Sequence, residues 1–145
     1  MPAPARSDPY GQFNFLVEID GIAVAQFAEC TGLSTETDVI EYREGGEPSL
    51  GARKLAGLTR YAPIVLKRGV TKDKSLWNWR KSVTDGHVSR RNGAIILLDA
   101  GRNEVARWNF RAGWPSRWEG PYLRASSSEV AIEALEIVHE GLDWA

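Results

Sequence analysis

A hairpin signal near the start of the chain constrains the fold more than any other feature of the sequence. Four apolar residues alternate with polar or smaller ones at the period of a strand: Phe13, Phe15, Val17 and Ile19. Asp20-Gly21 follows, and a second apolar run, IAVAQFAEC, comes directly after it. Asp-Gly between two such runs is typical of a tight β-hairpin. The sequence therefore predicts antiparallel sheet from its first regular elements.

Further strands are predicted along the chain. A third is expected at Thr37–Glu44 and a fourth at residues 60–68, where Pro63 favours an edge or strand-start position because proline lacks an amide donor. Residues 93–100 and 104–113 flank the turn DAGRN and predict a second hairpin.

Two segments lack this periodicity. Gly45–Leu58 holds four glycines and a proline, so we expect a long loop or an extended excursion there. Residues 114–123 contain two prolines and a glycine, which predict a loop anchored by aromatic side chains. In the last twenty residues the signals conflict, because propensity favours a helix that begins at Ser128 whereas alternation fits a strand with both faces buried or a bulge.

One helix of about three turns is predicted, with Thr71 or Asp73 as its N-cap and Gly86 as its C-terminal stop. Three residues at i, i+3 and i+7 form one apolar stripe on it: Leu76, Trp79 and Val83. Three lysines lie away from that stripe: Lys72, Lys74 and Lys81. Trp77 is also displaced from the stripe. One side of the helix is expected to be buried and the other solvated.

The size and composition fit one domain at residues 10–145, which follows a flexible N-terminal arm at residues 1–9. With 18 basic and 19 acidic residues the net charge is −1, so the chain lacks the cationic excess of a non-specific nucleic-acid binder. The single cysteine, Cys30, cannot form an internal disulfide. We find no signal peptide and no apolar run long enough to span a membrane, and therefore expect assembly in the cytoplasm.

No catalytic or metal-binding pattern stands out. His87 and His139 are the two histidines, no GxSxG motif occurs, and the histidines and the cysteine lie too far apart in sequence for a metal site. The segment GEPSLGARK lacks the Gly-Lys-Ser/Thr ending of a phosphate loop. We therefore expect no catalytic residue, no metal and no cofactor, and we interpret Arg90-Arg91 and the nearby cations as a solvated rim.

Six blocks in succession resemble the inner tube protein of contractile phage tails and of phage-derived, extracellular contractile injection systems: DPYGQFNFLVEIDGI, FAECTGLSTETDVIEYREGG, LKRGVT…LWNWR, RRNGAIILLDAG, WNFRAGWPSRWEGP and EVAIEALEIVHEGL. They cover nearly the whole chain. The resemblance implies a mostly β fold, with two packed antiparallel sheets in a barrel-like sandwich and one short α-helix, similar to the type VI secretion tube protein. It also favours a strand at the C-terminus.

The same resemblance implies a structural function without catalysis. Copies would form six-membered rings that stack into a hollow tube inside a contractile sheath, with baseplate or spike-hub and tube-terminating proteins as further partners and a protein effector or DNA as cargo in the lumen. The segment 45–58 would reach the next ring, with contacts expected from Glu44, Glu47, Ser49, Leu50, Arg53, Lys54 and Leu55. Asp8 and Tyr10 would make contacts from the N-terminal arm. Trp77 is the candidate partner contact on the helix.

Two alternatives stay open. A first-ring subunit that joins the tube to the baseplate would share the same blocks. From a different class, a monomeric β-barrel that carries a small apolar ligand would use the many aromatic residues to line a pocket.

Overall fold

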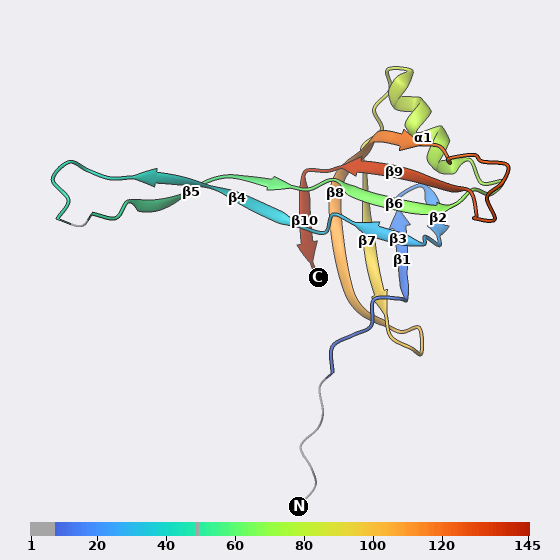
Figure 1. Cartoon of the computed structure of the whole chain (residues 1–145), viewed down its shortest axis with the longest axis horizontal. Helices are drawn as coiled ribbons and strands as arrows, with labels where there is room; N and C mark the ends of the chain where they lie inside the picture. The colour runs from blue at the N-terminus through green and yellow to red at the C-terminus, as the bar shows by residue number, and fades with distance from the viewer. Residues whose placement is uncertain (1–7, 49) are drawn as a thin grey trace, which may run out of the picture.

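The computed structural model describes residues 8–48 and 50–145, which form ten strands and one helix (Figure 1). The elements are β1 (Phe15–Ile19), β2 (Ile22–Ala25), β3 (Glu29–Thr31), β4 (Thr35–Tyr42), β5 (Arg53–Tyr61), β6 (Ile64–Gly69), α1 (Ser75–Thr84), β7 (Arg91–Leu98), β8 (Glu104–Glu119), β9 (Ile132–Val138) and β10 (Gly141–Trp144). All strand pairs are antiparallel. The expected mostly β fold with a short helix is confirmed.

The long strand β8 joins two sheets. Its first half pairs with β7 and β10, and its second half pairs with β9. The strand order is β2-β1-β7-β8-β9-β6-β3, with β10 beside β8 off this path and β4–β5 as a separate two-stranded sheet. The two halves meet at Ala112, whose φ of 52° lies in the left-handed region and whose amide donates to the side-chain oxygen of Asn92 at 3.0 Å. At this corner β8 passes from one sheet into the other, so one strand belongs to both layers of the sandwich.

The second half of β8 corrects the prediction of a loop at residues 114–123, because the strand continues to Glu119. Pro115 lies opposite Ile137, and the register shifts between Pro115 and Arg117. A bulge next to the proline lets the ladder continue although one amide donor is missing. Pairing with β9 therefore outweighs the local breaker signal.

The core lies between the two sheets and against α1. It contains Val17, Ile19, Ile64, Leu66, Leu76, Trp79, Ile95, Phe110, Leu135 and Ile137. Both predicted hairpins are present, since β1 pairs with β2 and β7 pairs with β8. The strand expected at residues 60–68 is interrupted, because β5 ends at Tyr61 and β6 begins at Ile64, directly after Pro63.

The helix begins at Ser75 and ends at Thr84. Asp73 accepts a hydrogen bond from the Ser75 amide at 2.9 Å, and this backbone hydrogen bond is the main reason that the pKa of Asp73 is lowered. Gly86 has a φ of 93°, and the amides of Gly86 and His87 donate to the carbonyls of Val83 and Ser82. That pair of bonds is a Schellman motif, which explains why the helix stops there.

The C-terminal segment forms strands, as the resemblance implied. In β9, Glu133, Leu135 and Ile137 are buried, whereas Ile132 is exposed. Burial of Glu133 is possible because Arg68 on β6 donates to it at 2.6 Å. Hydrogen bonding to β6 on one side and β8 on the other outweighs the helical propensity of this segment.

Candidate assembly surfaces

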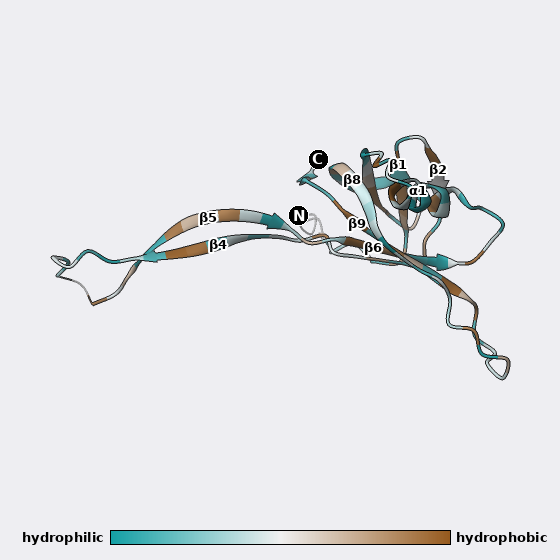
Figure 2. Cartoon of the chain, turned by 90° about the horizontal axis from the view of Figure 1, so that it is seen from above, coloured by the Kyte–Doolittle hydropathy of each residue, from teal (hydrophilic) through white to brown (hydrophobic). Residues whose placement is uncertain are grey.

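A hairpin arm extends far from the sandwich (Figures 1 and 2). We call residues 35–61, which contain β4 and β5, the arm. Thr31 pairs with Val65 at the edge of the sandwich, and Thr35 pairs with Tyr61 at the base of the arm. The same register runs through both pairs, so β3–β4 and β5–β6 form one long hairpin. Within the described residues, only the sandwich half of this hairpin is covered by further strands.

The joint between the two halves depends on Gly32. Its φ is 95°, and a Cβ atom there would collide with the carbonyl oxygen of Pro63. The Ser34 amide donates to the Gly32 carbonyl at 2.8 Å, and the Ala62 amide donates to the Ser34 carbonyl at 3.3 Å. A glycine is required where two backbones approach this closely. Gly32 therefore fixes the direction in which the arm leaves the sandwich.

The arm exposes apolar side chains on both strands and beyond them: Val39, Ile40, Tyr42, Leu50, Leu55 and Leu58. Because Val39 and Ile40 are neighbours on one strand, they point to opposite faces of the arm. An isolated two-stranded hairpin is marginally stable in water, and clustered exposed apolar residues mark contact surfaces. The arm of a single subunit therefore exposes apolar surface that only another molecule can bury.

Charged residues of the arm form three ion pairs, two of them across its strands and one between β5 and the loop before it. Lys54 lies 3.0 Å from Glu41, Arg60 lies 2.6 Å from Asp38, and Arg53 lies 2.7 Å from Glu47. The two cross-strand pairs are exposed, and pairs of this kind contribute about 0–1 kcal/mol each. They support the register of the arm but do not replace a covering partner.

The structure brings most of the predicted ring-contact residues to the distal part of the arm. Glu44 accepts a hydrogen bond from the Tyr42 hydroxyl at 3.2 Å, Leu50 is 94% exposed, and Leu55 pairs with Ile40. The segment 45–58 is only partly a loop, since β5 begins at Arg53. Ser49 lies outside the described residues.

The segment before β1 borders an apolar cleft. Asp8 and Tyr10 are exposed, and Tyr10 lines a cleft of about 750 Å³ together with Phe13, Leu33 and Trp108. Cys30 also lines it, and burial raises the pKa of this thiol to about 11. The thiol is therefore protonated at neutral pH and serves as a small apolar side chain.

The helix presents two kinds of side chain. Leu76 and Trp79 are buried, Val83 is half-buried, and Trp79 donates to the Ser89 carbonyl at 2.8 Å. Trp77 is 41% exposed and packs edge-on against Trp118, with ring centroids 4.8 Å apart.

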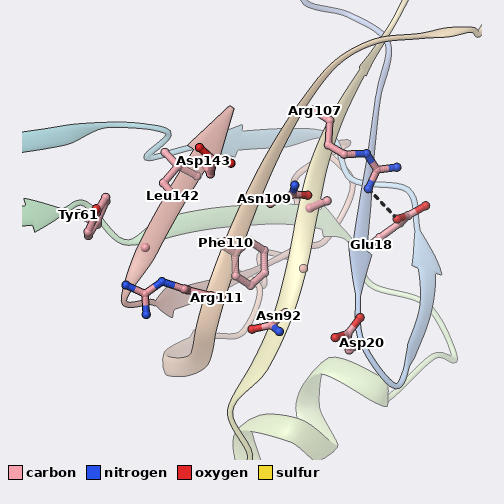
Figure 3. A pocket seen from close by; sticks show the side chains of 13 residues that line it. Glu18, Asp20, Tyr61, Asn92, Arg107, Asn109, Phe110, Arg111, Leu142 and Asp143 are labelled. Atoms are coloured by element: carbon pink, nitrogen blue, oxygen red, sulfur yellow. Dashed lines mark hydrogen bonds and ion pairs between the residues drawn. The ribbon is translucent and has the colours of Figure 1, made fainter. Parts of the chain in front are cut away.

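A polar cleft of about 450 Å³ is bordered by β1, β7, β8 and β10 (Figure 3). Arg107 bonds to Glu18 within it at 3.3 Å and to Glu104 at 2.7 Å, and the bond to Glu104 is the main cause that raises the pKa of Arg107. Its described lining contains no serine, threonine, cysteine, histidine or lysine. The cleft thus lacks the nucleophile and base of the hydrolase arrangements that depend on those residues.

Within the described residues, neither histidine is paired with a nucleophilic side chain. His139 lies between the carbonyls of Ala62 and Gly141, at 3.1 and 3.0 Å, and His87 is in the exposed turn after α1. Among residues 8–48 and 50–145, no group of three histidine, cysteine or carboxylate side chains is placed to hold a metal ion. No described helix is long and apolar enough to cross a membrane.

A buried ionic cluster was not predicted from the sequence. Arg68 and Glu133 are 6% and 8% exposed, and they bond at 2.6 Å. Arg68 also donates to Asp73 at 3.2 Å, and the Trp118 indole donates to Glu133 at 3.3 Å. The alternation of β9 places Glu133 with Leu135 and Ile137, but no sequence signal indicates the partner 65 residues away.

The geometry is that of a β-sandwich with an extended hairpin arm and exposed apolar residues on that arm. The chain belongs to the family of the T4-like virus tail tube protein gp19, which it matches over residues 11–143. The resemblance to tube proteins is therefore confirmed. No individual curated protein is significantly similar in sequence.

Solved structures of injection systems show the same fold. A chain of the anti-feeding prophage baseplate is 28% identical, with a TM-score of 0.85 and 97% of both chains covered. A chain of the anti-feeding prophage tube-terminating cap is 23% identical, with a TM-score of 0.88 over 99% of this chain and 95% of that one. A chain of the sheath–tube complex of the PVC extracellular contractile injection system is 24% identical, with a TM-score of 0.84 over 94% and 91%.

Proposed function

We propose that the chain is the repeating subunit of the inner tube of a contractile injection system or phage tail. Copies form hexameric rings, and the rings stack into a hollow conduit inside a contractile sheath. The arm is the observation that carries this proposal, because its apolar residues cannot be buried by the subunit from which it extends. Family membership over residues 11–143 supports the same assembly.

Ring closure uses unpaired strand edges. The order of strands ends at β2 on one side and at β3 on the other, so each has an outer edge that no strand of the described chain covers. Open edges pair readily with another chain, and a closed ring of copies removes them. A strand of the neighbouring subunit would therefore supply the missing hydrogen bonds.

Contact between rings uses the arm. Its end reaches the next ring through Glu44, Glu47, Ser49, Leu50, Arg53, Lys54 and Leu55, and assembly buries the apolar residues among them. Asp8 and Tyr10 make a second contact from the N-terminal segment. Trp77 contacts a partner protein from the exposed face of α1.

Partners of this tube are the contractile sheath, a baseplate or spike hub, and a terminating protein, with a protein effector or DNA as lumen cargo. The sheath–tube, baseplate and cap structures similar to this chain support that set. The subunit assembles in the cytoplasm, and the particle is then released or anchored. It acts mechanically and catalyses no reaction.

A second candidate is the first-ring subunit that joins tube to baseplate. The 28% identity to a chain of the anti-feeding prophage baseplate favours it. A monomeric ligand carrier would use the apolar cleft of about 750 Å³. That function would not explain the arm, whose apolar residues would stay exposed.

Size-exclusion chromatography at rising concentration and electron microscopy of the full chain test these functions. We expect rings and long stacked tubes for the repeating subunit, and single rings or caps for the adaptor. A carrier stays monomeric. The tube proposal is overturned if the concentrated protein remains monomeric even when the sheath and baseplate proteins of its own system are present.

A further inference from the structure

The exposed face of α1 carries a stripe with one cation on each side of a tryptophan. Lys74, Trp77, Asn78 and Lys81 are spaced at i, i+3, i+4 and i+7, and all are exposed. We call these four residues the helix stripe. They lie on the side of the helix opposite Leu76 and Trp79, which are buried in the core.

The charges around α1 differ from those of the remaining chain. Residues 72–91 contain six basic and two acidic residues, whereas the remaining residues contain twelve basic and seventeen acidic ones. A nearly neutral protein therefore has one strongly cationic segment, which would attract acidic groups.

The structure separates these cations into two groups. Arg80 donates to the Pro115 carbonyl at 3.1 Å, and Arg91 lies 5.5 Å from the Trp79 ring and donates to the Asp20 carbonyl. Arg80 and Arg91 therefore already have partners within the fold. In the described part of the chain the other four make no side-chain hydrogen bond or ion pair: Lys72, Lys74, Lys81 and Arg90.

Helix stability does not explain two of the free lysines. The first turn of α1 has no acidic residue, and Lys74 occupies the N-cap position without a side-chain hydrogen bond. Lys72 and Lys74 thus lie near the positive end of the helix dipole, where a cation is unfavourable. Lys81 in the last turn is favourable by the same argument. The lysines near the start of the helix act against folding, which points to a role outside it.

Trp77 is held in place between these cations. One side of its ring packs edge-on against Trp118, at 4.8 Å and 64°. The Trp118 indole is fixed in turn by Glu133 of the buried ionic cluster. An aromatic side chain that is already ordered loses little conformational entropy when it is covered.

We propose that the helix stripe binds an acidic segment of a partner protein. Lys81 follows Lys74 by seven positions, a helical rise of about 10 Å. The segment therefore carries two carboxylates about 10 Å apart with an apolar side chain between them, which covers Trp77. Nucleic acid fits less well, because the stripe is a convex helix surface with one exposed tryptophan. Proteins that bind single-stranded nucleic acid instead use a cationic groove with several aromatic side chains on which successive bases stack.

Fluorescence anisotropy with the full chain below its assembly concentration tests the proposal. The probe is a labelled, alanine-rich helical peptide with two glutamates seven residues apart and a leucine midway. We expect saturable binding that weakens as salt increases. The double variant Lys74→Glu/Lys81→Glu and the variant Trp77→Ala should each bind at least tenfold more weakly, with unchanged circular dichroism.

Arg102→Glu is the matched control. Arg102 lies in the β7–β8 turn, at the opposite end of β7 from α1, so a cation-to-carboxylate reversal there should leave binding unchanged. Unchanged affinity of the stripe variants overturns the proposal, as does equal binding of a peptide with adjacent glutamates. Equally tight binding of a 16-nucleotide poly(dT) strand, lost in the same variants, would assign the stripe to polyanions in general. Loss of self-assembled tubes in the double variant would assign it to a second copy of the chain.

Discussion

The sandwich and the arm share one long hairpin, yet their apolar residues differ in burial. Leu66 on β6 is 1% exposed, whereas Leu55 on β5 is 48% exposed. β6 lies between β3 and β9 and against the core, but β5 pairs only with β4. Full burial of a leucine side chain contributes about 1.5–3 kcal/mol. The sandwich gains this free energy when the subunit folds, and the arm can gain it only when another molecule covers it.

The largest effect is expected from the core side of the helix. Trp79→Ala removes a side chain that is 2% exposed and leaves a cavity where α1 packs against the core. We expect the free energy of unfolding to fall by about 3–5 kcal/mol, as measured by urea denaturation. This loss is large enough to unfold many domains.

Trp77→Ala is the control on the same helix. It removes an exposed ring whose contact with Trp118 is worth about 0.5–1.5 kcal/mol. The subunit should therefore remain folded. If both variants lose the same stability, the division of α1 into a core side and a contact side is wrong.

The buried ionic cluster tests whether the sandwich depends on polar pairing. Arg68→Met leaves Glu133 buried without its cation, and we expect a loss of about 3–5 kcal/mol in urea denaturation. Arg68→Met/Glu133→Leu removes both charges and should recover much of that loss. A double variant as unstable as the single one would show that packing around Arg68, rather than charge pairing, is responsible.

Local signals predicted the parts of the fold that are formed by neighbours in sequence. Asp20-Gly21 joins β1 to β2, and Gly86 ends α1. Strand β5, the second half of β8 and the inward position of Glu133 were not predicted. Each depends on a partner distant in sequence, such as Val138 opposite Trp114 or Arg68 beside Glu133. Propensity and turn residues carry no information about such partners.

The arm was predicted only in part for a related reason. Its glycines favoured a loop, and the resemblance to tube proteins supplied its expected contact with the next ring. The structure adds the continuous register from β3 and β6 and the joint at Gly32. The collision that requires this glycine comes from Pro63, which is 31 residues away, so local sequence could not reveal it.

Variants of the arm should separate assembly from folding. Ile40→Ser/Leu55→Ser replaces an exposed cross-strand pair. The free energy of unfolding of the monomer should change by less than about 1 kcal/mol, since exposed substitutions have small effects. The concentration needed for tubes should rise at least about tenfold in sedimentation, because a contact residue that loses its apolar surface costs more than about 1 kcal/mol.

Val88→Ser is the matched control for the arm. Val88 is also an exposed apolar residue, but it lies in the turn after α1. Its loss should leave the assembly concentration unchanged. A large fall in monomer stability for the arm variant would mean that the arm is part of the folding unit, and the comparison with the sandwich would fail.

The smallest effect concerns the start of α1 at low pH. The hydrogen bond from the Ser75 amide lowers the pKa of Asp73 below its ordinary value, so the folded state favours the charged carboxylate. A carboxyl whose pKa is lowered by folding contributes stability that is complete above its unfolded pKa of about 3.9. That contribution is lost as the pH falls through the folded pKa.

Asp73→Asn should therefore flatten the decrease in stability below about pH 4 and leave its slope near pH 7 unchanged. Urea denaturation at several pH values measures both slopes. Because the Asp73 side chain is about half exposed, the difference should be far smaller than that of Trp79→Ala. An unchanged acid slope in the variant would show that Asp73 does not anchor the helix, and that the core contacts of Leu76 and Trp79 hold α1 by themselves.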